Sequence, residues 1–183
     1  SIIKKMLPTP SKSHYTFNLR DISSVIQGIL MISKEQINVP QDMLRLWCHE
    51  SARVFEDRLV SEEDKSWFHN HQRDMLMKYF DADWEVTDFK NIVFGDFMTR
   101  EEKFYQEVDK IESCQELLVD YLTDYNVNFN KDVLLVFFKD AIQHIARVCR
   151  ILRQPRGNAL LVGVGGSGRQ SVTRLASFMA DYK

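Results

Sequence analysis

The sequence has 183 residues, 44% hydrophobic and 27% charged, with only four prolines and seven glycines. Such a composition is typical of a globular chain that buries a substantial core, and it excludes wholesale disorder. The formal net charge of −2 gives no general attraction to nucleic acid or acidic lipid, and no apolar stretch is long enough to span a bilayer, so we expect neither a nucleic-acid nor a membrane partner.

The N-terminal part of the chain predicts an extended linker followed by a bundle of three helices. The prolines of the opening ten residues favour the linker, because each disfavours helix in the residue before it. The helices are expected to begin after Asn18, at Pro40 and after Ser61, since each of these residues is favoured at a helix start. Residues at helical spacing are expected to face the core: Ile22, Val25, Ile26, Ile29 and Leu30, then Leu44, Trp47, Cys48, Phe55 and Leu59, then Trp67, Phe68, His71, Met75, Tyr79 and Phe80.

The helical spacing fades between Trp84 and Met98, where residues 92–94 predict a short strand or extended segment. Thr99 and Glu102 form a capping-box pattern, which predicts a charged helix to about Tyr125. Residues 126–130 predict a turn by composition. A long apolar helix is then expected over residues 132–152.

After residue 154 the pattern changes from helix to strand, turn and helix. Pro155 and Gly157 end the preceding helix, and the short apolar run 158–162 predicts a buried parallel strand. A helix is expected again over residues 171–182. Since the partner strands of such a sheet would lie after Lys183, we expect residues 160–162 to pack irregularly, to pair with another chain or to be poorly ordered.

The glycine-rich turn between that strand and helix predicts a phosphate-binding loop. Gly163 and Gly168 have the spacing of a loop in which Gly and four further residues precede Gly-Lys-Ser/Thr. Glycines allow the backbone N–H groups to close around phosphate oxygens, and the following helix directs its positive end toward them. The expected phosphate-binding residues are Gly163, Gly165, Gly166, Ser167, Gly168, Arg169, Gln170 and Ser171.

Two positions of this loop depart from the pattern. Arg169 replaces the lysine, which keeps the positive charge but presents a planar fork instead of a point charge. Gln170 replaces the magnesium-binding hydroxyl and is a weaker ligand. We therefore hypothesise that the loop binds ATP or ADP, with Mg²⁺ binding weakened, and hydrolyses ATP slowly or not at all. No catalytic residue and no protein metal site is assigned.

The residues leave two alternatives open. The first is a non-catalytic helical interaction or scaffold module in which the glycine turn is purely structural. The second is a nucleoside-phosphate-binding enzyme of another class, for which no catalytic acids can be located. The three cysteines, Cys48, Cys114 and Cys149, are distant from one another and predict buried, reduced thiols.

Both ends of the chain resemble axonemal dynein heavy chains. Residues 156–162, the variant loop and residues 172–176 resemble the start of the fourth AAA+ module, where Arg-Gln-Ser after the last glycine is typical. Residues 138–145 and 150–152 resemble the leading helix of that module. Residues 14–21 and 27–29 resemble the helical lid of the third module.

The resemblance implies a mainly α fold: a helical AAA+ lid at 1–98, then the first helix, strand and loop helix of an incomplete α/β AAA+ large subdomain at 99–183. It implies that Arg20 is a sensor arginine for nucleotide in the preceding module. The parent would be an ATP-driven microtubule motor in the cytoskeleton of cilia and flagella. Its partners would be neighbouring AAA+ modules, the microtubule, and dynein light and intermediate chains. The chain itself is not expected to be catalytic, since the acidic strand and arginine finger of a complete site lie elsewhere in the parent.

Overall fold

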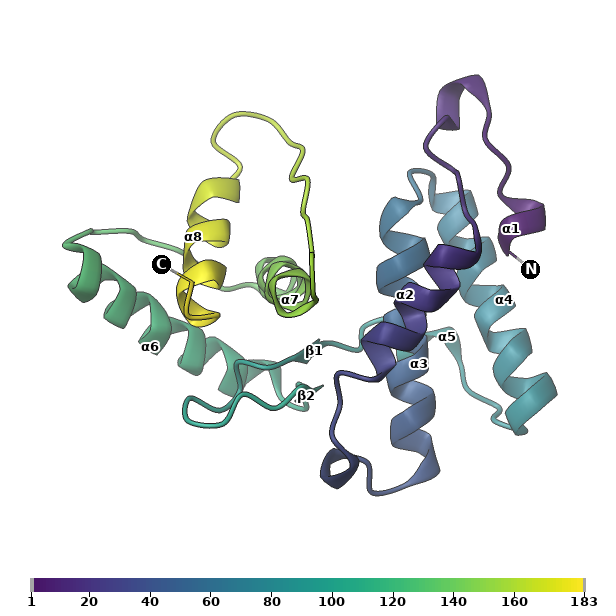
Figure 1. Ribbon diagram of the computed structural model, residues 1–183, viewed down its shortest axis with the longest axis horizontal. Coiled ribbons are helices and arrows are strands. Elements are labelled where there is room, and N and C mark those ends of the chain that lie inside the picture. The colour runs from purple at the N-terminus through teal and green to yellow at the C-terminus, as the bar shows by residue number, and fades with distance from the viewer. Residues whose placement is uncertain (1, 183) are drawn as a thin grey trace. The chain divides into compact units, whose positions relative to one another are not determined.

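The computed structural model describes residues 2–182 and divides the chain into two compact units, one ending at Ile92 and the other beginning at Val93 (Figure 1). Each unit has its own apolar core. The division falls before the expected residue 98, because strand β1 (Phe94–Gly95) pairs with strand β2 (Gln106–Glu107) of the second unit. The described residues are mainly helical, as the sequence predicts.

The first unit contains the three predicted helices and two short ones. Its elements are α1 (Ile2–Lys5), α2 (Leu19–Ile29), α3 (Pro40–Phe55), α4 (Glu62–Phe80) and α5 (Val86–Phe89), with single 3₁₀ turns at Pro10–Lys12, Lys34–Gln36 and Glu56–Arg58. The prediction of an extended N-terminal linker is wrong for α1. Ile2 and Met6 are 9% and 5% exposed, and burying them in the core holds this segment as a helical turn.

The predicted starts of the three main helices are confirmed. At α2, Asn18 Oδ1 accepts from the Arg20 N–H at 2.8 Å while Asp21 Oδ2 accepts from the Asn18 N–H at 2.7 Å, a reciprocal capping box. Pro40 is the first residue of α3. Ser61 Oγ accepts from the Asp64 N–H at 3.3 Å at the start of α4.

The predicted buried faces are partly wrong. In α2, Val25 is buried, but Ile22, Ile26 and Leu30 are 45%, 52% and 76% exposed. In α4, Tyr79 and Phe80 are 64% and 55% exposed.

The buried face of α4 is instead formed by Phe68, His69, Gln72 and Leu76. Two of these residues are polar and find partners: Gln72 Nε2 donates to the Cys48 carbonyl at 3.0 Å, and His69 Nε2 lies 3.0 Å from Glu56 Oε1. Hydrophobic spacing alone could not identify this face, because buried polar side chains are stable where they have hydrogen-bond partners.

The second unit contains β1, β2 and three helices, α6 (Ile111–Phe129), α7 (Lys139–Arg153) and α8 (Arg169–Met179). The strands are antiparallel, with Phe94 opposite Glu107. The strand predicted near residues 92–94 is thus confirmed in position. The helix predicted from Thr99 to about Tyr125 is confirmed from Ile111 onward, as α6, whereas its predicted start at Thr99 is wrong. Thr99 Oγ1 donates to the Glu102 carbonyl in a turn, and Tyr105 is 1% exposed against Phe94, with ring centroids 5.7 Å apart.

Two further boundaries in this unit differ from the prediction. The turn expected at 126–130 is wrong, since α6 continues to Phe129 and ends at Asn130 in the left-handed conformation. The long helix expected from residue 132 begins only at Lys139. The Asn126 side chain explains this difference, because it bonds both the N–H and the carbonyl of Val133, at 3.1 and 3.0 Å, and so fixes an extended segment.

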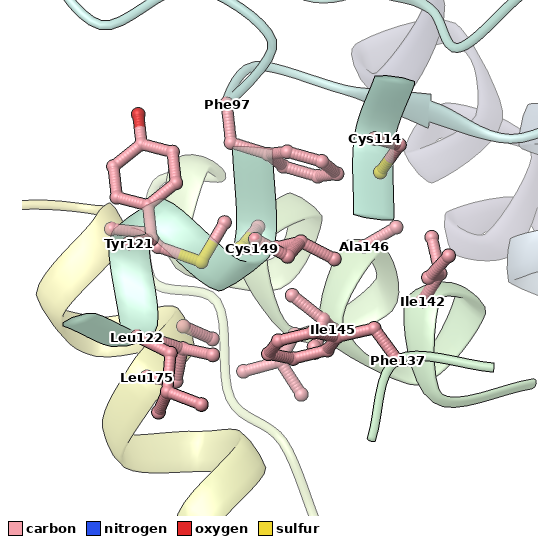
Figure 2. Packing of buried hydrophobic residues seen from close by; sticks show 14 of the residues in the cluster. Phe97, Cys114, Tyr121, Leu122, Phe137, Ile142, Ile145, Ala146, Cys149 and Leu175 are labelled. Atoms are coloured by element: carbon pink, nitrogen blue, oxygen red, sulfur yellow. The ribbon is translucent and has the colours of Figure 1, made fainter. Parts of the chain in front are cut away.

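The core of the second unit fastens α8 to α6 and α7. Figure 2 shows side chains from these helices converging in it. Leu175, Ala176 and Met179 of α8 are at most 2% exposed. All three cysteines are buried and unpaired by disulfides, as predicted. Among the described residues, none of the helices is long and apolar enough to cross a membrane.

Candidate functional site

The chain reaches the glycine loop through a tight turn and an irregular segment. After α7, the Gly157 N–H donates to the Gln154 carbonyl at 3.0 Å, and a Cβ at Gly157 would lie 1.9 Å from the Ile151 carbonyl oxygen. The turn that was predicted to end this helix therefore requires glycine. Residues 158–164 then run without regular structure, along the long connection to α8 in Figure 1.

The buried parallel strand predicted at 158–162 is not formed in the part of the chain that the structure describes. Leu160 and Val162 are 89% and 83% exposed, so the segment has no sheet around it. This outcome agrees with the expectation that residues 160–162 pack irregularly.

The loop is shaped by two glycines in the left-handed region. Gly166 and Gly168 have φ of 79° and 74°, a conformation that an L-residue adopts only with strain. Gly168 is the N-cap of α8, which runs for 11 residues from Arg169. The loop is therefore built as a turn that ends at the start of a helix.

An open cavity of about 880 Å³ lies at this turn. A Cβ placed on Gly165, Gly166 or Gly168 would meet no described atom within 4 Å, so the loop backbone is accessible. The cavity is lined by the predicted residues Gly165, Gly166, Ser167, Gly168, Arg169, Gln170 and Ser171, together with Leu161, Thr173 and Arg174. Gly163, also predicted, does not line it.

Arg169 extends back across the loop instead of into solvent. Its Nη2 donates to the Val164 carbonyl at 2.9 Å, and its Cδ would lie 3.5 Å from a Cβ on Gly163. Gln170 is exposed, and Ser171 is half-buried. The Thr173 hydroxyl donates to the Arg169 carbonyl at 2.8 Å, which secures the first turn of α8.

The residues present fit a phosphate group. Accessible backbone N–H groups at the start of α8, its positive dipole end and a nearby guanidinium are the elements of an anion site. They do not fit magnesium in the same way, because Gln170 supplies a carboxamide where such loops supply a hydroxyl. The arrangement is therefore suited to holding phosphate oxygens more than to holding the metal.

Arg20 lies in the other unit, in the first turn of α2. Its side chain is exposed, and among the described residues no hydrogen bond or ion pair holds its guanidinium. The structure thus brings the loop residues together and leaves the sensor role of Arg20 as a prediction.

Sequence reasoning missed three residues of the cavity wall, Leu161, Thr173 and Arg174. Thr173 carried a usable signal, because it follows Arg169 by four residues and so lies one helical turn further on. The contact between Arg169 and Val164 carried none, because its acceptor is a backbone carbonyl that every residue type possesses.

Comparisons with known proteins match both ends of the chain to described families. Residues 1–89 match an AAA+ lid domain, and residues 133–183 match the P-loop containing dynein motor region D4. Human dynein axonemal heavy chain 6 is 48% identical over 184 residues, covering 97% of this chain and 4% of the relative. Human dynein axonemal heavy chain 1 is 48% identical over 190 residues, covering 100% of this chain and 4% of the relative. Mouse dynein axonemal heavy chain 12 is 40% identical over 196 residues, covering 97% of this chain and 6% of the relative. The chain thus spans only a small part of the relatives that it matches.

Proposed function

This chain belongs to the axonemal dynein heavy chains, as a segment of their AAA+ motor region, and from that premise we propose that its glycine loop binds the phosphates of ATP or ADP. The observation that carries the proposal is the geometry of the loop. Two left-handed glycines lead into α8 beside an open cavity of about 880 Å³, and Arg169 lies at the same point. The ligand phosphates would be held by backbone N–H groups and by the guanidinium.

The proposed role of the site is regulatory and not hydrolytic. Gln170 stands where a hydroxyl would hold magnesium, and a carboxamide oxygen is a weaker ligand for a metal that demands near-ideal geometry. Hydrolysis needs the metal to neutralise the charge that develops on the transferred phosphoryl group. A loop that binds phosphate without holding magnesium firmly would therefore bind nucleotide and change with its presence, but would hydrolyse ATP slowly.

The same premise extends to the division of the chain between two AAA+ modules, which we propose to lie a few residues after the boundary of the compact units. We assign residues 1–98 to the helical lid of the third AAA+ module and residues 99–183 to the start of the fourth. The exposed guanidinium of Arg20, in the first turn of α2, is accessible to a phosphate group of the preceding module, which supports its proposed sensor role.

For the parent protein, we propose an ATP-driven microtubule motor of the axoneme. Its contacts would include the neighbouring AAA+ modules, dynein light and intermediate chains, and the microtubule. These proposals rest on the relatives, because the chain spans about 4% of the length of the human relatives.

The test is a calorimetric titration of the chain with ATP and with ADP, each with and without magnesium. We expect saturable binding that is nearly independent of magnesium. Arg169→Ala should weaken it by about 10- to 100-fold, the loss expected for a hydrogen bond to a charged group.

The matched control is Lys131→Ala, which removes one exposed positive charge from the same unit at a residue that does not line the cavity. It should bind as the unchanged chain does. If the folded chain binds neither nucleotide, the loop is a structural turn and the scaffold reading replaces this proposal.

A further inference from the structure

The glycine loop is closed by one of its own side chains. Arg169 is the first residue of α8, yet its Nη2 donates to the Val164 carbonyl five residues earlier, at 2.9 Å. Its stem covers Gly163, where a Cβ would lie 3.5 Å from both Cδ and Nε of Arg169 and 3.3 Å from Ser167 Oγ. The start and the end of the loop are thereby joined into a ring.

Little else in the described structure holds this ring. Added side-chain carbons at Gly165, Gly166 and Gly168 would meet no described atom within 4 Å, and the Val164 side chain is 79% exposed. The loop therefore lacks packing contacts across its middle. The bond from Arg169 to Val164 is the cross-loop contact on which its closed shape depends.

The guanidinium in this bond belongs to the first residue of α8, which also lines the cavity. We propose that Arg169 is a latch, which closes the loop on the Val164 carbonyl and passes to a phosphate group when nucleotide enters. The nucleotide half of this proposal rests on the proposed function, whereas the closure of the loop does not.

The exchange of acceptors follows from the chemistry of the two partners. A phosphate oxygen carries negative charge, so it attracts the guanidinium more strongly than the neutral carbonyl of Val164 does, and two parallel N–H donors of the fork can bind it. The planar fork of arginine has fixed donor directions, so turning toward the cavity removes its donor from Val164. Entry of a phosphate thus requires the latch to open, and the latch slows association without preventing it.

The mobility of the loop backbone in the chain without nucleotide, measured as NMR order parameters of the backbone amides, tests the latch directly. Arg169→Met keeps a long stem over Gly163 and removes every donor. We expect the order parameters of residues 164–168 to fall in this variant toward the values of a flexible loop, below about 0.6. The amides of Leu175 and Ala176 in the buried turn of α8 should be unchanged, which would show that the helix remains folded.

Arg174→Met is the matched control, because Arg174 lies on the same helix and lines the same cavity, and no hydrogen bond joins it to the described loop residues. The loop amides of this control should keep the order parameters of the unchanged chain. Equal order parameters for residues 164–168 in the unchanged chain and in Arg169→Met would overturn the latch.

Rapid mixing with ADP tests the second half of the proposal, the passage of Arg169 from the Val164 carbonyl to a phosphate group. Loss of a positive charge alone slows association, and Arg174→Met measures the size of that effect. If Arg169 is a latch, Arg169→Met should associate faster than Arg174→Met while dissociating faster than the unchanged chain. Association as slow as that of Arg174→Met would overturn the passage to phosphate. If none of the three proteins binds ADP, the proposed function fails, and the comparison of order parameters alone decides whether Arg169 latches the loop.

Discussion

Individual residues of the glycine loop are constrained by backbone conformation more than by neighbouring side chains. Gly168, at φ of 74°, is the N-cap of α8, so its left-handed conformation sets the direction in which the helix leaves the loop. Gly165 has no positive φ, and a Cβ there would meet no described atom within 4 Å. Neighbouring glycines thus carry different constraints.

Gly168→Ala should lower the free energy of unfolding of the second unit by about 1–2 kcal/mol, because an L-residue is strained in the left-handed region. Denaturant unfolding followed by circular dichroism measures the change. Gly165→Ala is the control and should change stability by less than about 0.5 kcal/mol. Equal effects of the two substitutions would mean that backbone strain is not what selects glycine at position 168.

The proposed weak binding of magnesium is assigned to Gln170. Gln170→Thr supplies the missing hydroxyl, so ATP should bind this variant several-fold more tightly with magnesium than without it. Titrations with and without the metal measure the ratio. Gln170→Ala should remain indifferent to magnesium, and the same indifference in Gln170→Thr would contradict the assignment of this position.

The sequence identifies the residues of the glycine loop, and all of the predicted residues except Gly163 line the cavity, because the spacing of the glycines and the nature of residues 169 and 170 can be seen in the chain itself. It does not predict where the Arg169 side chain turns. A positively charged residue at a helix start has no preferred acceptor until the loop backbone presents the Val164 carbonyl.

At the scale of elements, one polar cluster ties the N-terminal segment to α4. The Tyr15 hydroxyl donates to Asp64 Oδ2 at 2.8 Å and accepts from the Val60 N–H at 3.0 Å. Lys12 Nζ donates to the same carboxylate and, at 3.2 Å, to Ser61 Oγ. Tyr15 is 2% exposed, so the cluster joins the core at its inner end.

This cluster makes the stability of the first unit depend on pH. Burial tends to raise the pKa of Asp64, but hydrogen bonds from Lys12, Ser61 and Tyr15 outweigh it and hold the pKa below the usual 3.8. The carboxylate therefore stabilises the fold above its unfolded pKa, and that stability is lost as pH falls through the lower, folded pKa. The hydrogen bond to Asp64 raises the pKa of Lys12. The charged Lys12 side chain therefore stabilises the fold until the pH rises through that raised pKa.

Asp64→Asn should accordingly lower the free energy of unfolding of the first unit at pH 7, and its deficit should shrink as pH falls below about 3.8. Urea unfolding at a series of pH values measures both effects. Asp74→Asn, at an exposed position of α4, should show neither. A deficit that stays constant down to pH 2 would contradict the role of the ionised carboxylate.

Helix existence is predicted better than helix extent, and residues 133–138 show why. All six are apolar, so the run fits a helical and a strand-like period equally well. The structure resolves the ambiguity through Asn126, whose side chain bonds both backbone groups of Val133. The capping-box pattern at Thr99 does not start a helix for a similar reason. Residues of the predicted helix form strand β2 instead and pair with β1.

At the scale of the whole molecule, the chain has two separate cores, and tryptophan fluorescence reports on only one of them. All three tryptophans, Trp47, Trp67 and Trp84, lie in the first unit. Tryptophan fluorescence therefore reports the unfolding of the first unit alone, whereas the helical circular dichroism signal reports the unfolding of both units.

Leu118→Ala and Phe55→Ala create cavities in different cores, since Leu118 is 0% exposed in the second and Phe55 is 8% exposed in the first. Each should cost about 2–5 kcal/mol of unfolding free energy in its own unit. We expect Phe55→Ala to shift the tryptophan-monitored unfolding midpoint and Leu118→Ala to shift only the midpoint seen by circular dichroism. A tryptophan shift of equal size in both variants would show instead that the units unfold as one.

Alkylation of the buried cysteines can report how often each unit of the chain unfolds. Burial raises the pKa of the Cys48 thiol to about 12 and that of Cys114 to about 11, and it raises the pKa of Cys149 as well. Near neutral pH these sulfurs carry almost no thiolate, which is the form that alkylating reagents attack. A thiol that captures reagent has therefore left its core. Because Cys48 belongs to the first unit and the other two to the second, the mass and position of the adducts record which unit opened and how often.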